Sequence, residues 1–104
     1  MKNAVVKVRG TTGFFFATTL PPSEVKRVIW ETVDRFAQDT PGVVDRFVDQ
    51  EYERSLRVGL VIEAESFTDA DEKMQQLCNQ IVAKFAASSE PAKVDECATE
   101  LVPA

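Results

Sequence analysis

The chain has 104 residues, the length of one domain and too short for two independent hydrophobic cores. Twelve basic and seventeen acidic side chains leave a net charge of −5. This acidic balance weighs against a nucleic-acid or membrane-surface binder, because both need a cationic surface. The chain contains no histidine, so the commonest metal ligand and the commonest general base are both absent. We therefore expect one acidic domain over residues 1–104.

The first elements expected in the chain are two short strands joined by a turn. Valines at positions 5, 6 and 8 predict a strand over residues 3–9. Three phenylalanines followed by Ala-Thr-Thr predict a second strand over residues 13–19, because aromatic and β-branched side chains favour strands. Gly10 and Gly13 lie between them in the sequence Gly-Thr-Thr-Gly, which favours a hairpin turn.

Two segments carry the periodicity of amphipathic helices. The first is predicted over residues 22–38, where it begins after two prolines. The second is predicted over residues 68–87, with Thr68 as its capping residue. Apolar stripes on both helices should pack on the central strand of a sheet. We expect these side chains to be mostly buried: Val28, Ile29, Val33, Phe36, Leu60, Ile62, Met74, Leu77, Cys78, Ile81 and Phe85.

Three further strands complete the predicted sheet. Residues 55–65 alternate apolar and polar side chains, the clearest two-residue period in the chain. Residues 43–52 and 93–102 fit a helix or a strand. We predict strands, because 55–65 needs an antiparallel neighbour and the second helix needs a closing strand. The resulting order, (β)βαββαβ, is that of a ferredoxin-like plait, an α+β fold in which two helices cover one face of an antiparallel sheet.

No constellation of residues in the sequence indicates a catalytic site, a cofactor site or a metal site. Asp69, Asp71 and Glu72 form the densest acidic cluster, but the cluster lacks the glycine turn and distal glutamate of a calcium loop. Cys78 and Cys97 cannot complete a zinc site without histidine, and we expect both to be free buried thiols. We therefore predict no cofactor and no metal.

The three consecutive phenylalanines are the most informative feature of the sequence. Neighbouring residues of a strand point to opposite faces of a sheet, so at least one ring must lie on the face that the helices leave uncovered. Val61 is expected on that face as well. An apolar patch of this kind is typical of an interaction surface. The sequence therefore predicts an interface at Phe14, Phe15, Phe16 and Val61, with Trp30 of the first helix as a further candidate contact.

These observations favour a non-catalytic interaction module that forms homo-oligomers, most simply dimers, through the open face of its sheet. We expect self-association, with no nucleic-acid or membrane partner. Lys7 and Arg9 interrupt the N-terminal apolar stretch before a signal-peptide core can form, which predicts a cytoplasmic location.

Several other functional classes share this element order. RNA-binding domains of the RRM type stack bases on two central strands, but the strand at 55–65 offers no aromatic side chain for stacking. Three alternatives remain open: a ligand-binding regulatory domain, a cofactor-independent enzyme resembling the oxygenases of the dimeric α+β barrel type, and an accessory or structural protein of a phage or mobile element.

Overall fold

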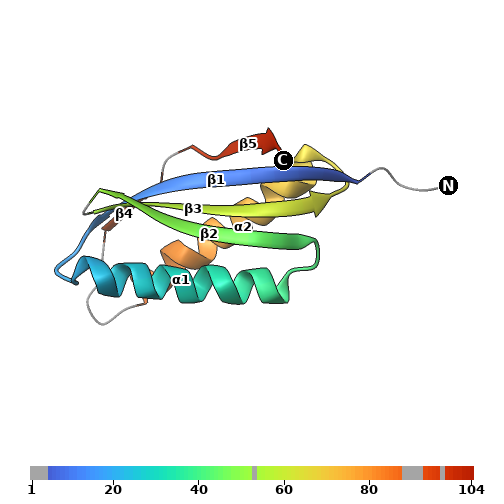
Figure 1. Ribbon diagram of the computed structural model, residues 1–104. Helices are drawn as coiled ribbons and strands as arrows, with labels where there is room; N and C mark the ends of the chain where they lie inside the picture. Colours follow the sequence, from blue (N-terminus) through green and yellow to red (C-terminus); the bar gives the residue numbers. More distant parts are fainter. Residues whose placement is uncertain (1–4, 53, 88–92, 97) are drawn as a thin grey trace.

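The computed structural model describes residues 5–52, 54–87, 93–96 and 98–104, and it contains one antiparallel sheet and two helices (Figure 1). The order across the sheet is β2-β3-β1-β4, and β5 lies on the same side of β1 as β4. This is the ferredoxin-like plait that the sequence predicted. The elements are β1 (Val6–Ala17), α1 (Pro22–Asp39), β2 (Val43–Tyr52), β3 (Ser55–Ala64), α2 (Phe67–Ala86), β4 (Lys93–Glu96) and β5 (Glu100–Pro103).

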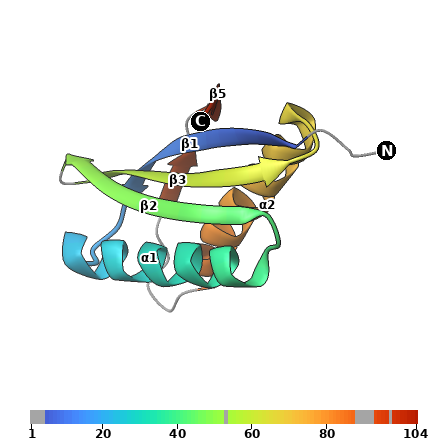
Figure 2. The same ribbon diagram turned by 45° about the vertical axis from the view of Figure 1, so that its right-hand side comes forward.

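Both helices pack on the same face of the sheet. In Figures 1 and 2, α2 crosses behind the strands and α1 runs beside β2. Along β1 the even-numbered residues from Val8 to Phe16 are buried beneath the helices, and the odd-numbered residues point to the other side. No helix among the described residues covers that second side, which is called the open face below.

The core lies between the helices and the covered face of the sheet. All eleven side chains expected there are buried except Val28, which is half-buried at the margin of the α1 stripe. The strands contribute more to the core than the sequence suggested. The buried apolar side chains added by β1 and β3 are Val8, Phe14, Phe16, Leu56, Val58 and Ala64.

β1 runs straight through Gly10 and Gly13, so the predicted hairpin turn is wrong. Neither glycine has a positive φ, and Gly42 (φ 92°) is the one described glycine that does. Gly10 instead permits a close approach of α2. A Cβ atom at Gly10 would lie 2.6 Å from Cγ of Met74 and 3.2 Å from Cδ2 of Leu101. The first of these distances is far below van der Waals contact, so close helix–strand packing requires a glycine here.

α2 begins at a different capping residue from the one predicted. Ser66 caps the helix, and its Oγ accepts a hydrogen bond from the amide of Asp69 at 3.1 Å, whereas Thr68 lies inside the first turn. The carboxylate of Asp69 in turn accepts from the amide of Glu65 at 3.3 Å and from Nζ of Lys73 at 3.1 Å. The lysine contact, followed by the amide contact, lowers the pKa of Asp69. The arrangement resembles a capping box, except that Asp69 bonds back to the amide of Glu65, the residue before the cap.

The two segments with ambiguous patterns are both strands, as predicted. Residues 43–52 form β2, with an irregularity in its pairing to β3 between Val43 and Asp45. The predicted closing strand is divided into β4 and β5, which pair with opposite ends of β1. Between them, the hydroxyl groups of Thr99 and Thr12 hydrogen-bond at 2.7 Å, which satisfies a polar side chain inside the core.

One of the two predicted buried thiols lies in the described part of the chain. Cys78 is a free cysteine on the buried face of α2. Burial raises its pKa to about 12, although a hydrogen bond with Thr12 acts in the opposite direction. A thiol with this pKa is almost fully protonated near neutral pH, which makes it a core side chain rather than a nucleophile. Cys97 lies outside the described residues.

Candidate functional site

The open face carries apolar and charged side chains in a mixed pattern. The strand register places Phe15 of β1 between Ser55 of β3 and Asp95 of β4, and it places Arg9 between Val61 and Val102. The open-face positions whose side chains the structure describes are Lys7, Arg9, Thr11, Gly13, Phe15 and Ala17 of β1, Asp45, Phe47 and Asp49 of β2, Ser55, Arg57, Gly59, Val61 and Glu63 of β3, Asp95 of β4, and Glu100 and Val102 of β5.

Only one of the three consecutive phenylalanines lies on this surface. Phe15 is 51% exposed. Phe14 and Phe16 are 0% and 4% exposed, because the alternation of the strand turns them toward the helices. The ring of Phe16 packs 5.0 Å from the ring of Phe85 on α2. Phe14 and Phe16 were predicted as interface residues, and this was wrong for both, since a partner on the open face cannot reach them.

Phe47 is an open-face aromatic residue that the sequence reading missed. Its ring lies over Gly59, where an added Cβ would be only 2.0 Å from the ring. The guanidinium group of Arg9 lies 4.8 Å above the same ring. Gly59 therefore leaves room for an aromatic ring flat on the sheet, and the stacked arginine holds that ring in place. Val61, which was predicted for this face, is half-buried beside this group.

The charges of the open face follow the order of the strands. Among the open-face side chains that the structure describes, the three cations lie on the two central strands, β1 and β3, and four of the five carboxylates lie on the strands at either side. Asp49 stands opposite Arg57 in the register, and Glu63 stands opposite Lys7. The cations are Lys7, Arg9 and Arg57, and the flanking carboxylates are Asp45 and Asp49 on β2, Asp95 on β4 and Glu100 on β5.

Trp30 is separate from this surface. It is 42% exposed on α1, and the guanidinium group of Arg46 lies 5.7 Å from its ring. Arg46 also donates to one carboxylate oxygen of Asp34 at 2.6 and 2.9 Å, which ties β2 to α1. The structure thus brings Phe15 and Val61 to one face and places Trp30 on the helical side, where it takes part in the packing of α1 on β2.

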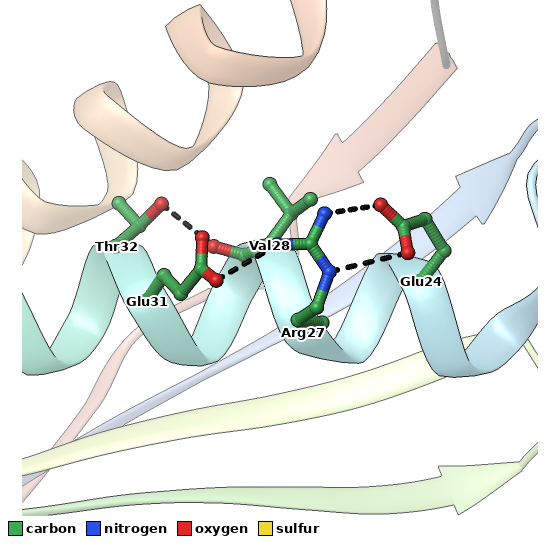
Figure 3. A network of polar contacts seen from close by, with 5 residues as sticks. All are labelled: Glu24, Arg27, Val28, Glu31 and Thr32. Atoms are coloured by element: carbon green, nitrogen blue, oxygen red, sulfur yellow. Dashed lines mark hydrogen bonds and ion pairs between the residues drawn. The ribbon is translucent and has the colours of Figure 1, made fainter.

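The outer surface of α1 is occupied by its own ion pairs (Figure 3). Arg27 reaches Glu24 on one side and Glu31 on the other, the latter at 2.7 Å. The hydrogen bond from Arg27 lowers the pKa of Glu24. Between these charges, Thr32 donates its hydroxyl to the carbonyl of Val28 at 2.8 Å. A partner bound here would have to desolvate charges that are already paired within α1.

A cavity of about 400 Å³ opens on the helical side of the sheet, at the end that is farthest from the N-terminus of β1. It lies between the β1–α1 connection and the turn that joins β2 to β3. Its apolar wall consists of Phe16, Leu20, Val25 and Leu56, together with the two prolines that begin α1. Its polar wall consists of Thr18, Thr19, Gln50 and Arg54.

Other site types find little support in the described part of the chain. There, no three histidine, cysteine, aspartate or glutamate side chains converge in a way that could hold a metal ion. Neither α1 nor α2 combines the length and the apolar character that a membrane-spanning helix needs.

Comparisons with known proteins identify the fold and no family. No protein-family model and no curated protein matches the sequence. Among solved structures, the chain is similar to a C-terminal segment of the alpha subunit of aIF2 from Pyrococcus abyssi, with a TM-score of 0.66 and 16% identity over 88% of this chain. It spans only 51% of that segment.

Two further solved structures are similar to this chain over most of their own length. A de novo designed protein with a ferredoxin fold has a TM-score of 0.65 and 10% identity, over 88% of this chain and 83% of its own. SnoaB, a cofactor-independent oxygenase from Streptomyces nogalater, has a TM-score of 0.57 and 14% identity, over 95% of this chain and 93% of its own. Identities this low support the ferredoxin-like α+β fold alone.

Proposed function

We propose that the protein is a non-catalytic assembly module that forms a homodimer through the open face. The observation that carries this proposal is the ring of Phe15, which is 51% exposed on the open face between β3 and β4, near the C-terminal end of β1. Half of a phenylalanine is about 100 Å² of apolar surface, and leaving it in water costs about 2.5 kcal/mol at 25 cal/mol per Å². Val102 and Phe47 extend the apolar surface on the same face.

The charges of the open face suit a second copy of the chain as its partner. A two-fold interface pairs one patch with itself, so each copy must offer both signs of charge. The open face does so, with cations along β1 and β3 and carboxylates on the strands at either side. When two sheets pack with their strands near a right angle, the central cations of one copy cross the flanking carboxylates of the other.

The size of the open face also suits a dimer. Four strands at about 4.8 Å spacing and ten paired residues at about 3.4 Å give roughly 650 Å² for each copy. A standard interface buries about 800 Å² for each partner, and projecting side chains add to the flat area of a sheet. The same face suits nucleic acid poorly, because its described carboxylates outnumber its three described cations.

The substitution Phe15→Asp tests the proposal. Each dimer contains the ring twice, so the loss of about 5 kcal/mol should raise the dimer Kd roughly four-thousandfold. Phe67→Asp is the matched control, because Phe67 is also exposed (42%) but lies at the start of α2. Sedimentation equilibrium at micromolar concentration should show a dimer for the wild type and for Phe67→Asp, and a monomer for Phe15→Asp. A monomeric wild type, or a dimer that Phe15→Asp leaves intact, refutes the proposal.

Trp30 serves as the competing contact in the same experiment. If Trp30→Ala dissociates the dimer and Phe15→Asp does not, the contact runs through α1. That outcome would transfer the interface to the helical side of the molecule, where Trp30 and Arg46 stack.

Ligand binding is a second candidate function, and the cavity beside α1 favours it. Its volume of about 400 Å³ falls in the range of small-molecule pockets. Arg54 is the single ionisable side chain among the described residues that line it. The cavity therefore offers recognition of a charge, whereas general acid–base catalysis needs a group that gains or loses a proton near neutral pH.

A further inference from the structure

We infer that the cavity between the β1–α1 connection and the β2–β3 turn binds a small amphipathic anion, an apolar or aromatic molecule that bears one carboxylate. This inference concerns the helical side of the sheet and does not depend on the proposed dimer. Two observations carry it: the shape and lining of the cavity, and an arginine in its wall that forms no ion pair within the described part of the chain.

The inner wall of the cavity is apolar and rigid. Phe16 comes from β1, Leu56 from β3 and Val25 from α1, and each belongs to the hydrophobic core. The backbone around them is also held in place, because the amide of Phe16 donates to the carbonyl of Arg54 at 3.0 Å and the amide of Leu20 donates to Oγ1 of Thr18 at 3.1 Å. An apolar group placed here would gain contact with side chains that are already ordered, which lowers the entropic cost of binding.

Arg54 supplies the charge recognition. Its side chain is exposed, and within the described part of the chain it forms no ion pair or side-chain hydrogen bond. Arg27 and Arg46 are both paired with carboxylates. A guanidinium group presents a planar pair of donors that matches a carboxylate, so an unpaired arginine at the rim of an apolar cavity selects an anionic head group.

The experiment compares two probes with the same phenylalkyl chain, one with a carboxylate head group and one with an uncharged hydroxyl. The protein labelled with ¹⁵N is titrated with 4-phenylbutyrate and, separately, with the uncharged 4-phenylbutan-1-ol, and amide shifts are followed by NMR. Saturable shifts are expected at residues 18–25 and 54–56, with a carboxylate Kd about five- to tenfold lower than the alcohol Kd, since hydrogen bonds to charged groups are the stronger ones.

Matched variants locate the charge recognition. Arg54→Gln should remove the preference for the carboxylate and leave alcohol binding unchanged. Arg35 is an exposed arginine on α1, outside the cavity, so Arg35→Gln should change neither the preference nor the alcohol Kd. The amide spectrum of each variant confirms its fold. The inference is overturned if no saturable shifts occur at the cavity, if the shifts map to the open face, if both probes bind equally, or if Arg54→Gln keeps the preference. Phe15→Asp should retain binding, which separates this inference from the dimer.

Discussion

The contact between β1 and α2 at Gly10 can be tested by adding one methyl group. In Gly10→Ala the new Cβ would lie 2.6 Å from Cγ and 2.9 Å from Sδ of Met74, which is fully buried and has little space to move. Overpacking of a core costs about 1–3 kcal/mol. Alanine has less conformational entropy than glycine in the unfolded chain, which offsets about 0.5–1 kcal/mol of this cost. We therefore expect the free energy of unfolding to fall by about 1–2 kcal/mol.

A double variant shows whether Met74 is the cause. Met74→Ala alone should cost about 2–5 kcal/mol, because it leaves a cavity in the core. In Gly10→Ala/Met74→Ala the added methyl group enters that space, so the double variant should be at least about 1 kcal/mol more stable than the sum of the single effects. Gly13→Ala is the control, because Gly13 points to the open face, away from Met74.

Urea denaturation followed by circular dichroism measures these changes. The measurements use the Phe15→Asp background, in which the proposed dimer should not form. With a slope of about 1–3 kcal/mol per molar urea, Gly10→Ala should lower the midpoint by roughly 1 M. If residues 10–13 formed a turn, Gly10→Ala and Gly13→Ala would destabilise alike and Met74→Ala would show no coupling. That result would refute the continuous strand.

Three further predictions concern single side chains. Ser66→Ala should lower the free energy of unfolding by about 1 kcal/mol in urea, and Thr68→Ala by at most a few tenths, since only Ser66 caps α2. Ile81→Ala should cost about 2–5 kcal/mol, and an unchanged midpoint would contradict its place in the core. In a Cys97→Ser variant, the remaining thiol of Cys78 should stay unreactive toward a disulfide reagent at pH 8 until the protein unfolds. Because burial raises its pKa from 9.0 to about 12, its contribution to stability should be complete below pH 9 and decline as the pH rises toward 12.

The sequence correctly predicted those elements whose apolar pattern matches the face that they bury in the fold. The apolar stripe of α1 and the alternation of β3 each need one buried face, and the fold provides it. Phe15 follows from the same logic, because alternation must place one ring of three opposite the other two. The prediction at Gly10 was wrong because glycine is required both by tight turns and by strands that a helix approaches closely, and the sequence does not distinguish the two.

The remaining parts of the candidate surfaces depend on long-range register. Phe47 was missed because Val43 and Phe47 are four residues apart, a spacing that also fits a helix, and the irregularity at Val43–Asp45 disturbs the alternation of β2. The cavity draws its walls from residues 16–25 and 50–56, which meet only when β1 pairs with β3 and α1 packs against the sheet. No local pattern in either segment predicts that the two segments lie side by side.

The central claim, a dimer formed through the open face, is tested most directly by intermolecular contacts. A mixture of isotope-labelled and unlabelled wild-type chains allows NMR to detect nuclear Overhauser effects that arise only between copies. The account predicts a mass of twice 11.6 kDa and intermolecular effects from the rings of Phe15 and Phe47 and the methyl groups of Val61 and Val102. A mass of 11.6 kDa at every concentration, or intermolecular effects confined to Trp30 and the helices, would contradict it.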